Sequence, residues 1–161
     1  MLQKDGTGSK EDFDGIRIQS LPQLRLTKEA EEFLGRLSLP LPKERLVVRE
    51  ERVYLSPEGI PDLQGLRVMR SGLLLGEMKK NRFEPSQALA CALKAEEYDA
   101  VCRLEATDED VIRYLKCETP AAKTGLPDGF VLVCAGDYPL GWAKAQNGVL
   151  KNKYLPGWRL M

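Results

Sequence analysis

Residues 128–157 read DGFVLVCAGDYPLGWAKAQNGVLKNKYLPG, and their pattern decides the fold class. The apolar run 130–135 predicts a buried strand, and residues 138–145 predict a second strand that pairs back on it. Asn147-Gly148 is a strong signal for a tight hairpin turn, so residues 149–152 become a third strand. Strands joined by such short turns predict a β-rich C-terminal half.

The rest of the chain alternates short helices with short strands. Thr27 is placed to cap a helix over about 28–38, which Pro40 ends. Two hairpins are expected next, one around the polar residues 49–52 and one with its turn at Ser71-Gly72. The later expected elements are a helix capped by Ser86, a strand over 100–106 and a helix over 107–117. This mixed order predicts an α+β fold, in which a small N-terminal α/β subdomain precedes a mixed β-barrel with short helices.

The composition is that of a globular protein. Of the 161 residues, 43% are hydrophobic and 30% are charged, which suits one ordinary domain or two small ones. No apolar run approaches the roughly 18 residues of a membrane-spanning helix, so no membrane partner is expected. Residues 1–20 begin with a polar stretch unlike a signal peptide and are expected to be a flexible linker. The corresponding expectation is a cytoplasmic protein.

Histidine is absent from the chain, which removes Ser-His-Asp and Cys-His catalysis. No C-x-x-C pair occurs, so a zinc site is not expected. We expect four reduced thiols, mostly buried, and neither a metal nor a cofactor bound by this chain. The cysteines are Cys91, Cys102, Cys117 and Cys134.

Charge is distributed unevenly along a chain whose formal net charge is zero. Residues 66–83 carry five basic and one acidic group, and residues 138–161 carry four basic groups and no acid. Between them, residues 84–119 carry four basic and nine acidic groups. If the fold brings the two basic segments together, they form one positive face that attracts a polyanion. We expect them to be adjacent.

Each basic segment also contains groups suited to RNA. Lysine and arginine can contact phosphates, asparagine can contact a base or ribose, and an aromatic ring can stack on an unpaired base. The candidate RNA-binding residues are Lys79, Lys80, Asn81, Arg82, Trp142, Lys144, Lys151, Asn152 and Lys153. For Trp142 the alternative is a place in the barrel core, with its indole N–H on a carbonyl. Trp158, which follows Pro156-Gly157 near the C-terminus, is expected to pack.

Two motifs carry a resemblance to a known family. They are LRVMRSGLLLGEMKKNRFEPSQALA (66–90) and GDYPLGWAKAQNGVLKNKYLPGWRL (136–160). In this order and spacing they resemble the C-terminal extension of RsmF-type (Sun family) rRNA cytosine-5 methyltransferases. The resemblance implies a PUA-like RNA-binding domain over 63–161, preceded by a small linking domain over 21–62.

The resemblance also implies a function. The module would position a methyltransferase catalytic domain, in cis or in trans, on structured rRNA of the small subunit. S-adenosylmethionine and the catalytic cysteines would belong to that catalytic domain. Nothing in this chain matches either feature, and Cys117 in KCETP lacks the Pro-Cys context. The chain is therefore not expected to be an enzyme on its own.

Two other hypotheses stay open from the sequence. In the first, the chain is a structural module that docks onto a catalytic domain through salt-insensitive apolar contacts. In the second, it is an unrecognised hydrolase or transferase that uses Asp137 or Glu77, although these residues also suit a turn and a strand surface.

Overall fold

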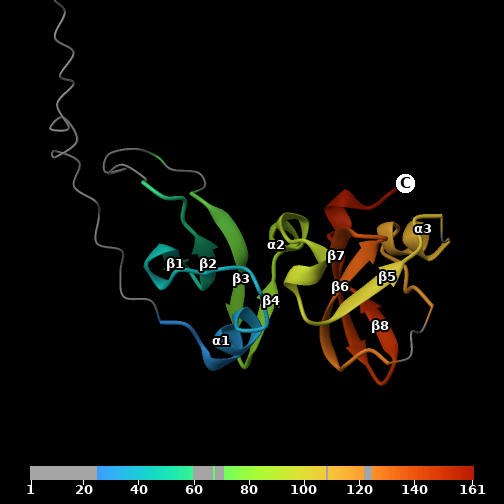
Figure 1. Cartoon of the computed structure of the whole chain (residues 1–161), viewed down its shortest axis with the longest axis horizontal. Coiled ribbons are helices and arrows are strands. Elements are labelled where there is room, and N and C mark those ends of the chain that lie inside the picture. The colour runs from blue at the N-terminus through green and yellow to red at the C-terminus, as the bar shows by residue number, and fades with distance from the viewer. Residues whose placement is uncertain (1–24, 60–66, 68–70, 108, 122–124) are drawn as a thin grey trace, which may run out of the picture.

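The computed structural model describes residues 25–59, 67, 71–107, 109–121 and 125–161, and these residues form two four-stranded sheets with short helices. The first sheet has the order β1-β2-β3-β4 and the second has the order β5-β6-β7-β8. The sheets occupy opposite ends of the molecule, and α2 lies between them (Figure 1). The predicted α+β class is confirmed.

The first sheet is antiparallel and is built from two hairpins. Its strands are β1 (Leu46–Arg49), β2 (Arg52–Leu55), β3 (Leu73–Lys79) and β4 (Arg82–Pro85). The predicted hairpin around residues 49–52 is confirmed. Its turn is Glu50-Glu51, whose φ angles of 47° and 66° give the left-handed geometry that matches the twist of the flanking strands.

The second hairpin forms later in the sequence than predicted. The expected turn at Ser71-Gly72 precedes β3, and the observed turn is Lys80-Asn81 between β3 and β4. Gly72 has a φ of 82°, and a Cβ there would lie against the carbonyl of Leu55, so glycine is required where the chain passes the end of β2. Residues 66 and 68–70, from the expected first strand, lie outside the described residues.

Strand pairing also shows where along the chain the first sheet ends and the second begins. The expected boundary between residues 62 and 63 falls between β2 and β3, and these strands pair with each other. Because β3 and β4 complete the sheet that β1 and β2 begin, the division between the two sheets lies after Pro85. Periodicity cannot reveal this, since it depends on which strands pair at long range.

Side-chain caps position the first helices. The helices are α1 (Lys28–Leu34), α2 (Gln87–Ala92) and α3 (Glu109–Leu115), with single 3-10 turns η1 (Lys43–Arg45), η2 (Ala95–Glu97) and η3 (Pro156–Trp158). The hydroxyls of Thr27 and Ser86 accept hydrogen bonds from amides in the first turns of α1 and α2. α1 ends earlier than the predicted helix over 28–38, because Leu37 pairs with Tyr98 as an isolated β-bridge.

The second sheet is mixed. Its strands are β5 (Val101–Leu104), β6 (Gly129–Ala135), β7 (Tyr138–Gln146) and β8 (Val149–Asn152). β5 and β6 are parallel, with α3 between them in the chain, and β6, β7 and β8 are antiparallel. The predicted Asn147-Gly148 turn is confirmed, with φ angles of 50° and 77°.

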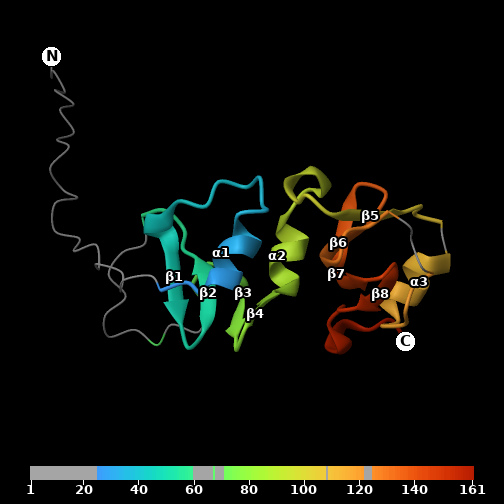
Figure 2. The same ribbon diagram turned by 90° about the horizontal axis from the view of Figure 1, so that it is seen from below.

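One hydrophobic core runs through both halves. Phe33 of α1 contacts Phe83 of β4, and the same ring lies 5.5 Å from the rings of both Tyr98 and Trp142. Figure 2, a view turned by 90°, also shows that α2 lies between the two sheets. The halves therefore pack as one body around an aromatic cluster.

The helices of the described residues are all too short or too polar to span a bilayer. None of the four cysteines, all of which the structure describes, forms a disulfide; Cys102 and Cys134 are buried, and Cys91 is exposed. Burial raises the pKa of Cys134 to about 11, which makes this thiol a poor nucleophile.

Candidate nucleic-acid interface

The β7–β8 hairpin carries two lysines directly opposite each other. Lys144 of β7 pairs in register with Lys151 of β8, and both side chains are exposed. The neighbouring positions Ala143, Ala145 and Leu150 point to the other face and are buried. The alternation of strand side chains therefore directs both lysines to solvent.

A third lysine, Lys153, extends this surface just beyond β8. Its side chain is exposed, and its backbone amide donates to the Trp142 carbonyl at 3.0 Å, which keeps it beside β7. Within the part of the chain that the structure describes, Lys144, Lys151 and Lys153 form no ion pair with a carboxylate. We call these three residues the lysine surface.

Asn152 is committed to the fold, contrary to its predicted contact with a base or ribose. Its side-chain amide nitrogen donates to the carbonyls of Tyr114 at 2.8 Å and Glu118 at 2.7 Å. Its side-chain oxygen accepts from the Tyr154 amide at 2.8 Å. The side chain thus satisfies carbonyls at the end of α3, and both of its donors are occupied.

Trp142 lies in the core, where it is only 1% exposed. The indole N–H donates to the carbonyl of Ser86 at 2.8 Å, and the ring packs against Phe33, Tyr98 and Phe130. The alternative place in the core is confirmed, and the buried ring presents no exposed face for the predicted base contact.

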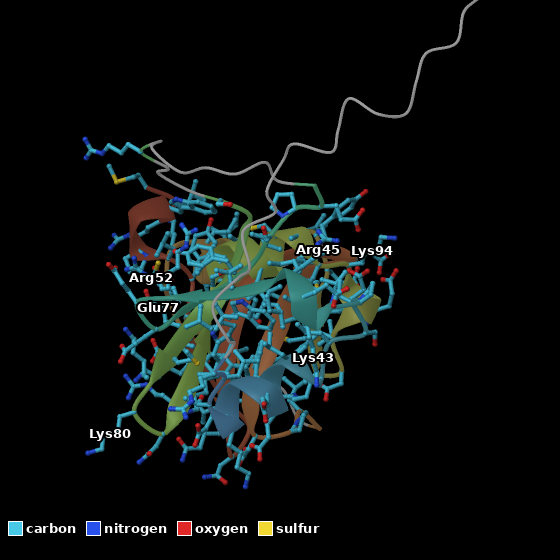
Figure 3. The ribbon with its side chains drawn as sticks, turned by 90° about the vertical axis from the view of Figure 1, so that its left-hand side faces the viewer. Lys43, Arg45, Arg52, Glu77, Lys80 and Lys94 are labelled. Atoms are coloured by element: carbon cyan, nitrogen blue, oxygen red, sulfur yellow. The ribbon has the colours of Figure 1, made fainter. Side chains whose placement is uncertain are left out.

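In the β3–β4 hairpin, two basic side chains are already paired with carboxylates of their own strands. Glu77 accepts from Arg52 at 2.8 Å (Figure 3), and it also pairs with Lys79. These hydrogen bonds, from Lys79 first and Arg52 second, lower the pKa of Glu77, and Glu77 in turn raises the pKa of Lys79. Arg82 pairs with Glu84 at 2.9 Å. Two of the four candidates here are thus already paired.

Lys80 and Asn81 form the turn of this hairpin and are both exposed. Figure 3 shows Lys80 extending away from the body of the molecule. Asn81 has a φ of 58°, a conformation that asparagine tolerates better than most residues, so the turn itself explains this residue. Lys80 is the candidate in this hairpin that forms no ion pair among the described residues.

The two basic segments lie in different sheets. The β3–β4 hairpin belongs to one end of the molecule, the β7–β8 hairpin belongs to the other, and α2 lies between them (Figure 1). The two basic hairpins therefore do not lie side by side in one sheet, as a single positive face built from adjacent strands would require. The lysine surface on β7–β8 is the stronger candidate, because its charges are uncompensated.

The sequence interpretation also assigned Trp158 to packing, whereas the structure leaves its side chain 55% exposed. Tyr138, at the start of β7, is 80% exposed. One signal could have separated the two tryptophans: Trp142 lies inside a strand among small residues, and Trp158 lies beyond the last strand.

The two carboxylates considered for catalysis have other roles. The lowered pKa of Glu77 is opposite to the shift that a general acid requires. Asp137 is exposed in the β6–β7 turn and accepts a hydrogen bond from Arg103 at 3.4 Å. Among the residues that the structure describes, no three histidine, cysteine or acidic side chains are grouped to hold a metal.

Fold and surface together define an α+β module of two packed sheets, the second of which carries exposed lysines. Comparison with known families shows where such a module occurs. Residues 32–93 match the first C-terminal domain of the RsmF rRNA methyltransferase, and residues 102–160 match the methyltransferase RsmF PUA domain. The chain belongs to the RsmF rRNA methyltransferase family, of which it carries these two C-terminal domains.

Individual relatives agree with the domain matches. The chain is 35% identical over 127 residues to the ribosomal RNA small subunit methyltransferase F of Shewanella sp. (strain ANA-3), covering 74% of this chain and 26% of the relative. It is 32% identical over 122 residues to the protein of the same name from Shewanella oneidensis, covering 74% and 25%. The chain thus spans about a quarter of the length of these relatives.

Proposed function

We propose that this chain is an RNA-binding module whose lysine surface contacts the phosphates of structured rRNA. The observation that carries the proposal is the Lys144–Lys151 pair. Like charges directly opposite each other destabilise a sheet, so the fold gains nothing from this arrangement. A phosphate beside the two ammonium groups would remove the repulsion and release counterions. The names of the relatives support small-subunit rRNA as the target.

The structure suggests a hierarchy among the predicted contacts. Lys144, Lys151 and Lys153 can contact phosphates without breaking an ion pair, and so can Lys80 at the tip of the other hairpin. Lys79 and Arg82 would first have to exchange a carboxylate for a phosphate. We therefore assign most of the electrostatic affinity to β7–β8 and a smaller share to β3–β4.

The module would work together with a methyltransferase domain. The match covers 26% of a relative that is named as a methyltransferase, so the catalytic domain would lie in the part that this chain does not match. That domain would bind S-adenosylmethionine and contribute the nucleophile. This chain would hold the rRNA in position and perform no chemistry itself.

The test is a titration of labelled small-subunit rRNA fragments with the purified chain, followed by fluorescence anisotropy at several salt concentrations. We expect the logarithm of affinity to fall linearly with the logarithm of salt. The double variant Lys144→Glu/Lys151→Glu should bind more weakly and reduce that slope by about 1.4 to 1.8, since each phosphate contact contributes roughly 0.7 to 0.9.

A matched control changes the same number of charges elsewhere. Lys28 and Lys43 are exposed in the N-terminal half, so Lys28→Glu/Lys43→Glu should leave most of the affinity and the slope intact. Equal losses in both double variants would mean that only net charge matters. Absence of binding at low salt, combined with salt-insensitive capture of a methyltransferase domain, would favour the docking hypothesis instead.

A further inference from the structure

Trp158 stands at the surface on a segment that is fixed at both ends. On one side, Tyr154 packs against Tyr114 of α3 with ring centroids 5.5 Å apart. On the other side, the amide of Leu160 donates to the carbonyl of Leu115 at 2.9 Å. Between these anchors, η3 holds the backbone of Trp158 in a single turn. The side chain is thus presented from an ordered support rather than from a free tail.

The indole is available to a ligand. Its side chain is 55% exposed, and in the described part of the chain it makes no ring contact with another aromatic residue and its Nε1 donates no hydrogen bond. An indole left half in water forgoes the burial that makes tryptophan stabilising in a core. Trp142 shows the opposite arrangement, since both its ring and its N–H are satisfied.

Positive charge lies on both sides of this indole in the sequence. Lys153 precedes η3 and Arg159 follows Trp158 directly, and both side chains are exposed. Neither forms an ion pair among the described residues. β8 ends at Asn152 and η3 begins at Pro156, so only a short segment that includes Lys153 connects the lysine surface to η3. The phosphate backbone of an RNA bound along the lysine surface can therefore continue past Trp158.

We propose that Trp158 is a stacking platform for an unpaired nucleobase of the bound RNA, with Lys153 and Arg159 contacting the adjacent phosphates. This inference rests on the proposed function and adds the kind of RNA. A base in a duplex has both faces covered by its neighbours, whereas an unpaired base can stack on an aromatic side chain. The module then selects structured RNA that has an unpaired nucleotide beside the helix.

The chain offers a direct optical readout, because it has two tryptophans and only one is exposed. We would titrate the full chain with a single-stranded 12-nucleotide RNA and with a blunt duplex of the same sequence. The single strand should quench the emission of Trp158 and leave that of Trp142, whereas the duplex should quench little. The variant Trp158→Phe isolates the Trp142 emission, which also reports that the fold is intact.

Affinity supplies the second readout. Trp158→Ala should weaken binding of the single strand about tenfold, since the truncated side chain cannot stack on a base. Binding of the duplex should change less than twofold, and Trp158→Tyr should restore most of the single-strand affinity. Tyr138→Ala, which removes the other exposed aromatic residue of this half, is the matched control and should bind normally.

The outcomes separate this inference from the proposed function. If Trp158→Ala binds the single strand normally while Lys144→Glu/Lys151→Glu does not, the stacking site is wrong and the phosphate surface stands. If Tyr138→Ala is the variant that loses single-strand affinity, the platform has been assigned to the wrong residue. If wild type binds neither RNA, both proposals fail. Loss of association with a methyltransferase domain in Trp158→Ala, with RNA binding unchanged, would overturn the stacking role in favour of a protein contact.

Discussion

Trp142 donates its indole N–H to the carbonyl oxygen of Ser86 at 2.8 Å, and this hydrogen bond links the two sheets. Ser86 caps α2 directly after the last strand of the first sheet, and Trp142 lies in β7 of the second. The same ring contacts Phe33, from the N-terminal half, and Phe130 of β6. Trp142, which the sequence offered as a base contact, thus connects the two sheets through its hydrogen bond and its ring contacts.

Replacement of Trp142 should therefore destabilise the fold. Trp142→Ala removes a fully buried ring and leaves a cavity, and we expect the free energy of unfolding to fall by about 3 to 5 kcal/mol. Trp142→Phe keeps part of the ring volume and removes the indole donor, while the Ala90 amide still donates to the Ser86 carbonyl, so a smaller loss is expected. Urea denaturation followed by circular dichroism measures both. A variant that remained as stable as wild type but lost RNA affinity would contradict the structural role.

The position of Trp142 shows why sequence patterns located strands β6 to β8 but not the side chains available to a ligand. The Asn147-Gly148 turn and the apolar alternation depend on neighbours in the chain, and these predictions are confirmed. Whether an aromatic residue in a strand faces the core or solvent depends on what packs above it. Here Phe33 and Tyr98, distant in sequence, cover Trp142. The pattern of β7 alone could not reveal that cover.

The Lys144–Lys151 pair should make stability and RNA affinity change in opposite directions. Lys151→Glu converts a repulsive cross-strand pair into an attractive one, so the free energy of unfolding should rise by up to about 1 kcal/mol. RNA affinity should fall, because one phosphate contact is replaced by a repulsion. Thermal unfolding and anisotropy titration on the same sample measure the two effects.

Lys79→Glu provides the contrast for that experiment. It replaces the ion pair with Glu77 by a repulsion, so stability should fall rather than rise. Its effect on RNA affinity should be smaller than that of Lys151→Glu, because Lys79 already has a carboxylate partner. If Lys151→Glu lowered the melting temperature as Lys79→Glu does, Lys151 would have a structural partner that outweighs its repulsion with Lys144.

The contrast between these lysines also shows what can and cannot be predicted by counting charges in the sequence. The excess of basic residues in 66–83 and in 138–161 is visible in the sequence. Which of those charges are paired is not visible, because pairing depends on side-chain conformation. Lys79 and Arg82 form ion pairs with carboxylates of their own strands, while Arg52 from β2 also binds Glu77. The lysine surface of the second segment has no carboxylate partner among the described residues.

Glu77 should make the stability of the protein depend on pH in the acid range. Its pKa is lowered by Lys79 and Arg52, so the folded state binds a proton less readily than the unfolded state does. The stabilisation is complete above the ordinary glutamate pKa of about 4.3, and it is lost as pH falls through the lowered pKa of the folded state. Wild type should therefore exceed Glu77→Gln in stability at pH 7, and the difference should shrink toward pH 3.

Urea denaturation of both proteins between pH 7 and pH 3 measures this difference. Glu96→Gln is a suitable control, since Glu96 is exposed and forms no ion pair among the described residues. Its stability should follow that of wild type at every pH. A constant gap between wild type and Glu77→Gln across the range would show that the Arg52–Glu77–Lys79 cluster does not contribute through its charge.

Gly76 should be the least replaceable residue of the first sheet. It lies in β3, and a Cβ there would stand 2.5 Å from the carbonyl oxygen of Glu84 and against the ring of Phe83. The backbone oxygen is fixed by the sheet, and the Phe83 ring is held by Phe33 at 5.1 Å, so neither can move freely. Gly76→Ala should therefore lower the free energy of unfolding by about 1 to 3 kcal/mol.

Two variants make this prediction specific. At Gly157 nothing lies within 4 Å of an added Cβ, so Gly157→Ala should be tolerated. Adding Phe83→Leu to Gly76→Ala removes part of the obstructing ring, so the double variant should be more stable than the sum of the two single losses predicts. Additive losses, measured by urea denaturation, would mean that the Glu84 carbonyl alone excludes a side chain at Gly76. In that case β4 itself, rather than the aromatic cluster, would impose glycine on the centre of the sheet.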